Sequence, residues 1–515
     1  MDALIRGLLR AEAYDHPVTN FEVLETHISW VILTGEYAYK LKKPVNFGFV
    51  DFTTLERRQF FCQEELRLNA RLADDLYLAV KPIYGPQDHP TFVGTGEPIE
   101  YAVQMRQFPQ SVLLPEVLQR GELKRDSLDQ CAQDVARFQK QAAVAGIADS
   151  YGSLADIWTA TSECLLPLEQ VPELAATTQK LHFWATGEHH RMQEEFRHRK
   201  ESGKIREGHG DMHLGNMLLR NNKIEVFDCL EFNPTLRWID VVSEVAFLVM
   251  DLADRGHPNL GRRFLNRWLE QTGDYAGLRV WRWYLAYRAL VRAKVAQLRR
   301  NQPDLNADAR RQLLGQAKDY LRVAESVTQP AEPVLILASG LSGSGKSHWT
   351  ERLVEQSGFI RIRSDVERKR LAGLCGDTPQ FTGDLYSAEA SEKTYRQLLS
   401  LAGELLANNF SVVVDATFLR KSQRAPFRQL AIERNVAHQL IEFRAHPKTL
   451  RERIAERSRR GSDPSDATIE VLEHQLQIAE PVTGDEGWPM ITIDTDQSDV
   501  ETRLMSQILL GVTSA

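Results

Sequence analysis

One stretch decides the fold of the last third of this 515-residue chain: Val334-Leu335-Ile336-Leu337-Ala338, then Gly340-Leu341-Ser342-Gly343-Ser344-Gly345-Lys346-Ser347. The first five residues predict a buried strand, and the polar run after Ser347 predicts a helix. The glycines between them match the pattern G-x-x-x-x-G-K-[ST], in which backbone N–H groups curl around phosphate at a helix N-terminus. The residues of the predicted phosphate-binding loop are Gly340, Ser342, Gly343, Ser344, Gly345, Lys346 and Ser347.

Two side chains of this loop are suited to hold a magnesium nucleotide. Lys346 is placed to reach the β- and γ-phosphates of ATP, and Ser347 is placed to ligate Mg²⁺. Asp415 follows the predicted buried strand 411–414, a position from which a carboxylate holds the metal directly or through water. The alternative for Asp415 is an ordinary strand end.

Two further groups are candidates for the transfer step. Asp365 follows the predicted strand 359–363 and is the candidate general base toward an acceptor hydroxyl; its alternative role is a helix N-cap. Arg453 and Arg457 lie one turn apart on an arginine-rich helical stretch, where arginines can close on a transferring phosphate. The alternative for these two arginines is a solvated basic helix face.

Residues 334–500 resemble the P-loop kinases that include polynucleotide kinases, gluconate-type kinases and zeta-toxin-like kinases. The resemblance is carried by the glycine loop, by Ser364-Asp365, by Val414-Asp415 and by the arginine-rich stretch. Predicted strands alternate with helices throughout this region, which indicates an α/β domain with a doubly wound parallel sheet. The group phosphorylates diverse acceptors, so the resemblance implies ATP and Mg²⁺ but names no substrate.

A second catalytic pattern lies in the middle of the chain, at Gly208-His209-Gly210-Asp211-Met212-His213-Leu214-Gly215-Asn216, followed by Asp228. It has an Asp, an Asn five residues later, and an Asp at the end of a predicted strand. In such a loop Asp211 accepts the proton of the acceptor hydroxyl, while Asn216 and Asp228 hold Mg²⁺ against the phosphates of ATP. This pattern predicts a second phosphotransfer site.

These residues resemble the aminoglycoside phosphotransferase and choline-kinase-like branch of the protein-kinase fold, whose H-G-D-x-x-x-x-N motif is present in full. The resemblance covers roughly residues 20–325 and implies a bilobal α+β fold with a strand lysine paired to a helix glutamate. Lys40, on a predicted strand, and Glu65, in the helix that follows, fill these positions best and would contact ATP. Lys42, on the same face of that strand, and Glu64 are the alternatives. Asp240 matches a downstream Asp that braces the catalytic loop in this group.

Two features of this half leave alternatives open. The spacing of His209, Asp211 and His213 permits a small zinc cluster. The segment Glu25-Thr26-His27-Ile28-Ser29, where a glycine-rich loop should cover the phosphates, has no glycine. A pseudokinase that binds ATP without turnover is therefore the alternative to an active N-terminal kinase.

The motifs and composition shifts predict two domains. The first is 1–325, with a strand-rich small lobe at about 20–109 and a helical large lobe at about 110–325. A polar, proline-containing linker at 326–333 leads to the P-loop domain at 334–515. We expect the two halves to fold separately, because each carries its own set of phosphate and metal ligands.

Composition restricts the class of partner and the compartment. Hydrophobic residues make up 43% of the chain, enough for more than one core. The net charge of -7 argues against a dedicated nucleic-acid-binding protein and leaves a nucleic-acid acceptor as an alternative for the C-terminal domain alone. Five scattered cysteines without a C-x-x-C pair argue against a disulfide framework, and no apolar run is long enough to span a membrane. The expected compartment is a reducing cytoplasm.

Together these patterns predict a bifunctional ATP-dependent phosphotransferase that acts on hydroxyl groups of small molecules. The alternative, of a different class, is a regulatory ATP-binding protein in which the N-terminal half senses a ligand and the P-loop half is an ATPase switch. Stoichiometric transfer of phosphate to an acceptor would support the first interpretation. Hydrolysis of ATP without an acceptor would support the second. The patterns name neither acceptor.

Overall fold

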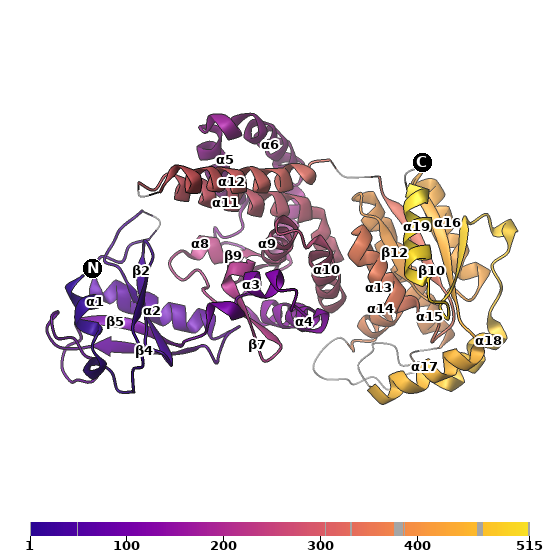
Figure 1. The fold of residues 1–515 in the computed structure, drawn as a ribbon. Helices are drawn as coiled ribbons and strands as arrows, with labels where there is room; N and C mark the ends of the chain where they lie inside the picture. Colours follow the sequence, from indigo (N-terminus) through magenta and orange to yellow (C-terminus); the bar gives the residue numbers. More distant parts are fainter. Residues whose placement is uncertain are drawn as a thin grey trace. The chain divides into compact units, whose positions relative to one another are not determined.

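The computed structural model describes residues 2–48, 50–303, 305–329, 332–374, 385, 387–460 and 467–512 (Figure 1). Contacts within the chain divide it into two units, which are described separately. Unit 1 comprises Met1–Asp251 and Trp283–Leu321, and unit 2 comprises Leu252–Arg282 and Arg322–Ala515.

A five-stranded antiparallel sheet forms the small lobe of unit 1. Its strands lie in the order β1 (Glu22–Glu25), β2 (Ser29–Leu33), β3 (Tyr37–Lys42), β5 (Glu100–Arg106), β4 (Tyr77–Ile83). Helix α2 (Leu55–Asn69) connects β3 to β4 and shares an apolar cluster with the sheet, in which Cys62, Tyr77 and Val103 are buried. A single helix inserted in an antiparallel sheet is the arrangement expected for a kinase-like small lobe.

The large lobe of unit 1 is mainly helical. Its helices are α3 (Leu114–Gln119), α4 (Arg125–Gln141), α5 (Leu154–Glu169), α6 (Pro172–Arg191), α7 (Gln193–Glu201), α8 (Pro234–Arg237), α9 (Val241–Asp254), α11 (Trp281–Arg300) and α12 (Ala307–Ser326). Two small antiparallel ribbons interrupt them: β6 (Ile205–Glu207) with β9 (Trp238–Asp240), and β7 (Met217–Arg220) with β8 (Lys223–Val226). The segment 208–216 connects the two ribbons, which fix both of its ends.

Unit 2 contains a five-stranded parallel sheet. Its strands lie in the order β11 (Ile360–Arg363), β12 (Val412–Asp415), β10 (Val334–Ser339), β13 (Ala437–Arg444), β14 (Met490–Asp494). The helices that follow β10 along the chain are α13 (Lys346–Ser357), α14 (Ser364–Leu371), α15 (Ala388–Ala407), α16 (Lys421–Glu433), α17 (Pro447–Arg460), α18 (Ile469–Ile478) and α19 (Val500–Val512). The predicted fold, a doubly wound parallel sheet with a P-loop, is confirmed.

The division of the chain differs in one respect from the sequence-based domains. Helix α10 (Pro258–Thr272), which lies within the range predicted for the first domain, belongs to unit 2 and packs against α13 and β11. Arg263 of α10 and Glu355 of α13 form a buried ion pair with Nη1 and Oε1 2.6 Å apart. Sequence patterns identify α10 as amphipathic but do not specify which core covers its apolar face. Residues 330 and 331 of the predicted linker lie outside the described residues.

Separating the chain at residue 329 is therefore expected to destabilise the P-loop half. A fragment of residues 330–515 lacks α10, so it exposes the surfaces of α13 and β11 that α10 covers and loses the ion pair of Glu355 with Arg263. Chemical denaturation of this fragment should show a lower free energy of unfolding than unit 2 shows in the intact chain. Equal stability of the two would contradict the assignment of α10 to unit 2.

Candidate active sites

A buried charge cluster lies at the centre of unit 1. The Nζ atom of Lys40 lies 2.7 Å from Glu65 Oε1 and 2.7 Å from Asp228 Oδ1. Lys42, two residues further along β3, lies 2.7 Å from Glu65 Oε2 and also pairs with Glu231. The structure thus places three predicted residues, Lys40, Glu65 and Asp228, in one group, and it adds a partner that the sequence did not indicate, Glu231, which pairs with Lys42.

Mutual attraction keeps Lys40 and Glu65 of this cluster charged. Burial by itself would lower the pKa of Lys40, but Asp228 and Glu65 raise it well above its usual value. Burial would likewise raise the pKa of Glu65, whose exposed fraction is 0%, but the two lysines lower it to about 2. An ionised Lys40 held at Asp228 is positioned to meet the phosphates of a nucleotide.

The pKa of Glu65 predicts how unit 1 responds to acid. A carboxyl whose pKa falls from 4.5 to about 2 on folding contributes stability above pH 4.5, and this contribution is lost as the pH falls toward 2. Each pKa unit corresponds to about 1.4 kcal/mol. Glu65→Gln should therefore lower the free energy of unfolding at neutral pH and flatten its decline between pH 4.5 and 2. Denaturant titrations across this window check it; an unchanged slope would contradict it.

The predicted catalytic loop places Asp211 beside Asn216. The side-chain amide of Asn216 donates to the backbone carbonyl of Asp211 at 3.0 Å and to its Oδ2 at 2.9 Å. His213 Nε2 lies 3.5 Å from the same Oδ2. Burial would raise the pKa of Asp211, but its interactions with His213, His209 and Arg292 lower it below its usual range. Asp211 is therefore ionised at neutral pH and able to accept a proton.

The backbone of this loop is fixed by buried side chains of α9 and α11. Glu244 accepts hydrogen bonds from the N–H groups of His209 and Gly210, and Asp251 accepts one from Leu214 N at 3.0 Å. Arg288 of α11 donates to the carbonyl of Gly210 at 2.9 Å. These contacts determine the path of the chain on both sides of Asp211.

The expected brace, Asp240, has a different role. Its carboxylate forms a fork with Arg199, with separations of 2.5 and 2.7 Å, and accepts from Val242 N at the start of α9. It does not reach the catalytic loop in these contacts because the short strand β9 directs it toward α7. Glu244 and Asp251 take its place, and no local motif distinguishes them from other acids in a helix.

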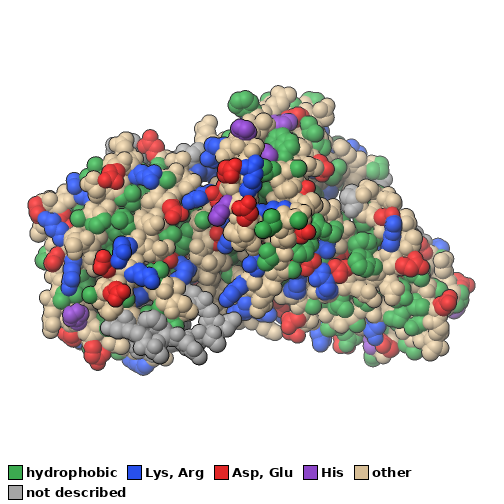
Figure 2. All heavy atoms as spheres, turned by 180° about the vertical axis from the view of Figure 1, so that it is seen from behind, with side chains coloured by type: hydrophobic (Ala, Val, Ile, Leu, Met, Phe, Trp, Pro, Cys, Tyr) green, Lys and Arg blue, Asp and Glu red, His purple; other side chains and the backbone are tan. Residues whose placement is uncertain are grey.

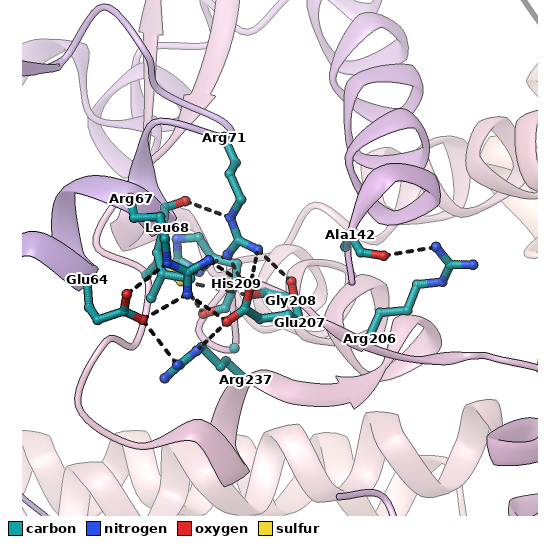
Figure 3. Close-up of polar contacts among 12 residues, drawn as sticks. Glu64, Arg67, Leu68, Arg71, Ala142, Arg206, Glu207, Gly208, His209 and Arg237 are labelled. Atoms are coloured by element: carbon teal, nitrogen blue, oxygen red, sulfur yellow. Dashed lines mark hydrogen bonds and ion pairs between the residues drawn. The ribbon is translucent and has the colours of Figure 1, made fainter. Parts of the chain in front are cut away.

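A network of charges ties α2 to the entrance of the catalytic loop (Figure 3). Arg71 donates to the carbonyls of Glu207 and Gly208 at 2.7 and 3.0 Å. Arg67 bridges Glu64 and Glu207, and Arg237 also donates to Glu207. These residues come from α2 and the turn after it, from β6 and Gly208, and from α8, so the network fixes the helix that carries Glu65 relative to the loop that carries Asp211.

The zinc alternative has no geometric support. His209 Nε2 lies 2.9 Å from the carbonyl of Phe227, and burial lowers the pKa of this histidine. Among the residues that the structure describes, no group of three or more His, Cys, Asp or Glu side chains is arranged to hold a metal ion. Asn216 and Asp228 remain the candidate Mg²⁺ ligands of unit 1, with the oxygen donors that Mg²⁺ prefers.

The glycine-free turn between β1 and β2 closes on itself. Thr26 N donates to the carbonyl of Ser29 at 2.9 Å, and the two hydroxyl oxygens lie 2.8 Å apart. Ser29 N also donates to Thr26 Oγ1. Since both hydroxyls are engaged within the turn, their use as substitutes for glycine N–H contacts to phosphate would require these bonds to break.

In unit 2, the predicted phosphate loop connects β10 to α13. Gly340 and Gly345 have φ values of 146° and 83°, which favour glycine, and a Cβ on Gly340 would lie 2.4 Å from the carbonyl oxygen of Phe443. Lys346 begins α13, and its Nζ donates to the carbonyl of Leu341 at 3.2 Å. Burial lowers the pKa of Lys346. The loop has the conformation that its glycine spacing predicts.

One pocket of about 1080 Å³ collects most of the predicted groups of unit 2. Its lining includes Ser342, Gly343, Gly345, Lys346, Ser347, Asp365, Asp415, Arg453 and Arg457. Ser347 and Asp415 offer a hydroxyl and a carboxylate, a donor set that fits Mg²⁺. Asp415 is 4% exposed and accepts from Thr350 Oγ1 at 3.3 Å. The far side of the pocket is lined by Tyr395, Arg396, Leu399, Arg420 and Phe427.

Three of these groups have partners that sequence reasoning did not identify. Asp365 lies in the first turn of α14, where its Oδ1 is 2.9 Å from Arg368, so it is not the N-cap. Arg453 donates to the carbonyl of Gly343 at 3.3 Å and to Thr495 Oγ1 at 2.8 Å. Arg457 donates to the carbonyl of Ala467 at 2.8 Å. Arg453 therefore supports the phosphate loop in addition to facing the pocket.

One family model matches a segment that lies within unit 2. The family model "AAA domain" matches residues 335–482. A choline/ethanolamine kinase family protein from Mesorhizobium loti has 12% identity to this chain, covers 63% of it and 99% of its own length, and has a TM-score of 0.38. A gluconokinase from Sinorhizobium meliloti has 24% identity, covers 36% of this chain and 93% of its own length, and has a TM-score of 0.25.

A protein of Mycobacterium tuberculosis is related in sequence to most of this chain. The uncharacterized protein Rv2004c is 32% identical over 474 residues, which span 88% of this chain and 90% of the relative. The alignment is too long to be contained in either unit alone, so it extends over both. The chain has a kinase-like N-terminal unit and a C-terminal P-loop domain, and it belongs to the same family as Rv2004c.

Proposed function

We propose that this chain is an ATP-dependent phosphotransferase with two sites, each acting on a hydroxyl group of a small molecule. The observation that supports it best is that each unit collects a lysine, a carboxylate that ends or follows a strand and a second carboxylate that can accept a proton. In unit 1 these are Lys40, Asp228 and Asp211; in unit 2 they are Lys346, Asp415 and Asp365.

In unit 1, Asp211 accepts the proton of the acceptor hydroxyl as its oxygen attacks the γ-phosphorus of ATP. The bond from the γ-phosphorus to the bridging oxygen breaks, and ADP leaves. Mg²⁺ supplies charge neutralisation for the phosphates when it is bound. Asn216 and Asp228 would hold it, while Asn216 also orients Asp211 through its amide hydrogen bonds.

In unit 2, Lys346 neutralises charge on the β- and γ-phosphates, and Asp365 accepts the acceptor's proton. At about 1080 Å³ the pocket slightly exceeds the roughly 300–1,000 Å³ typical of ligand sites, a size that suits a nucleotide with a small acceptor beside it. On the face drawn in Figure 2, Lys and Arg side chains are interspersed with Asp and Glu, which favours a small-molecule acceptor over a nucleic acid.

A regulatory role is the second candidate. The glycine-free turn at Thr26–Ser29, closed by its own hydrogen bonds, favours a unit 1 that binds ATP without transferring phosphate. In that case unit 2 alone would consume ATP. In the described ranges no helix combines the length and apolar character needed to cross a membrane.

The two sites can be separated by labelling. Full-length protein is incubated with γ-labelled ATP, Mg²⁺ and a fractionated pool of cell metabolites, beside Asp211→Ala and Lys346→Ala variants. We expect at least one labelled product to disappear in each variant. Products that disappear only in Lys346→Ala would assign transfer to unit 2 and support the regulatory role for unit 1.

A further inference from the structure

The phosphate loop of unit 2 is supported by a helix that lies outside the AAA match. Glu270, in the last turn of α10, is 5% exposed, and its Oε1 accepts from Arg361 Nε at 3.1 Å and Nη2 at 2.7 Å. We propose that Glu270 is a positioning residue for the Mg²⁺–nucleotide site of unit 2. This inference rests on the proposed function of that unit and adds a residue that the P-loop motifs do not contain.

The link from Glu270 to the loop runs through one guanidinium. Arg361, on β11, is 2% exposed, and its Nη1 donates to the carbonyl of Ser347 at 2.9 Å and to Thr350 Oγ1 at 3.4 Å. Thr350 in turn donates to Asp415 Oδ2 at 3.3 Å. The same arginine therefore binds Glu270 on one side and the backbone of a candidate metal ligand on the other.

A second arginine of β11 gives Glu270 an electrostatic role. Arg363 lies between two carboxylates: its Nη1 is 3.7 Å from Glu270 Oε2, and its Nε is 3.8 Å from Asp415 Oδ2. With Glu270 ionised, the positive charge of Arg363 is shared between the two. Loss of the Glu270 charge would strengthen the pull of Arg363 on Asp415, and a tighter Arg363–Asp415 pair would compete with Mg²⁺.

The position of Glu270 is specified by the docking of α10 on the edge strand β11. One turn before Glu270, Asn266 Oδ1 accepts from Arg361 N at 2.7 Å, and Asn266 Nδ2 donates to the carbonyl of Phe359 at 3.2 Å. The amide side chain thus occupies backbone groups that an edge strand would otherwise expose. Because residues four apart share a helix face, this contact sets Glu270 opposite the Arg361 side chain.

Three neighbouring arginines keep the carboxylate of Glu270 ionised. Burial would raise the pKa of Glu270, but Arg361, Arg363 and Arg267 lower it to about 2. Arg267 Nη1 lies 2.9 Å from Glu270 Oε2, and Arg267 also pairs with Glu351 of α13. Glu270 therefore carries its negative charge throughout the neutral range.

The test uses the full chain carrying Lys40→Ala, which removes the lysine of unit 1, and follows binding of a fluorescent ATP analogue as Mg²⁺ is titrated. Glu270→Gln is expected to raise the Mg²⁺ concentration for half-maximal binding about tenfold. Glu270→Gln with Arg363→Gln should restore most of this loss, because the cation that competes for Asp415 is gone. Arg363→Gln alone, which keeps Glu270, should lower the Mg²⁺ concentration for half-maximal binding. This single variant tests the inference even if Glu270→Gln fails to fold.

Arg262→Ala is the matched structural control. Arg262, on the same helix, donates to the carbonyls of Glu355 and Gln356 at the end of α13 and makes no contact with Arg361 in the described contacts. It should lower the Tm without changing the Mg²⁺ requirement. If Glu270→Gln lowers only the Tm, as Arg262→Ala does, or if Arg363→Gln leaves the Mg²⁺ requirement unchanged, the inference is overturned.

If the parent and a Lys346→Ala variant both lack Mg²⁺-dependent binding, the proposed nucleotide site of unit 2 fails and the inference fails with it.

Discussion

Replacing Lys346 with Ala is expected to reduce nucleotide turnover by unit 2 about 10²–10³-fold while leaving the unit folded. The ammonium is buried at the start of α13, and its hydrogen bond in the structure is to the loop's own carbonyl at Leu341. It can therefore turn to phosphate without losing a partner elsewhere in the fold. Its removal takes away charge compensation where negative charge is concentrated during transfer.

This result is measured as release or transfer of label from γ-labelled ATP, in a chain whose unit 1 carries Asp211→Asn. Lys448→Ala is the matched control, since the side chain of Lys448 is 79% exposed at the start of α17. The control should retain full turnover. Residual turnover in Lys346→Ala equal to that of Lys448→Ala would contradict the assignment of the phosphate loop.

In unit 1, Asp211→Asn is expected to spare nucleotide binding and to remove transfer, by about 10²–10⁴-fold. The carboxylate of Asp211 is held by the amide of Asn216 and has no contact with Lys40 in the described contacts, so binding of ATP does not depend on its charge. Asp228→Asn is expected to weaken Mg²⁺-dependent binding instead, because it removes a metal ligand and one of the two carboxylates that hold Lys40.

Calorimetric titration of Mg²⁺–nucleotide and a transfer assay together check this division. They are run on a chain carrying Lys346→Ala, so that unit 2 does not contribute. Asn216→Ala should resemble Asp228→Asn in its weaker metal-dependent binding. Equal loss of binding in the Asp211, Asn216 and Asp228 variants would indicate a structural role for all three residues and contradict the roles assigned to them.

Local patterns predicted most of unit 2 correctly. The strands β10, β11 and β12 lie within one residue of the predicted ranges 334–338, 359–363 and 411–414 at each end. The conformation of the glycine loop was also predicted, because the spacing of its glycines and Lys346 is typical of a phosphate-binding loop. Asp365 and Asp415 lie further along the chain than Lys346 and Ser347, yet all four line one pocket. They meet there because parallel strands end at the same edge of a sheet.

The parts that sequence did not predict depend on tertiary pairing. Helix α10 has an amphipathic pattern, but nothing in that pattern specifies that it covers β11 rather than the core of unit 1. The brace of the catalytic loop was expected at Asp240, whereas Glu244 and Asp251 provide it. In both cases the partner lies far away in sequence, and charged side chains in a helix carry no local signal of what they contact.

The central claim is that the γ-phosphate of ATP ends on an acceptor hydroxyl. The most direct test measures, for the full chain with the metabolite fractions that stimulate ADP formation, the ratio of phosphorylated acceptor formed to ADP formed. We expect this ratio to approach one, with each product lost in either Asp211→Asn or Lys346→Ala. ADP accompanied by an equal amount of inorganic phosphate, with no labelled acceptor in any fraction, would contradict the claim and show that the chain hydrolyses ATP.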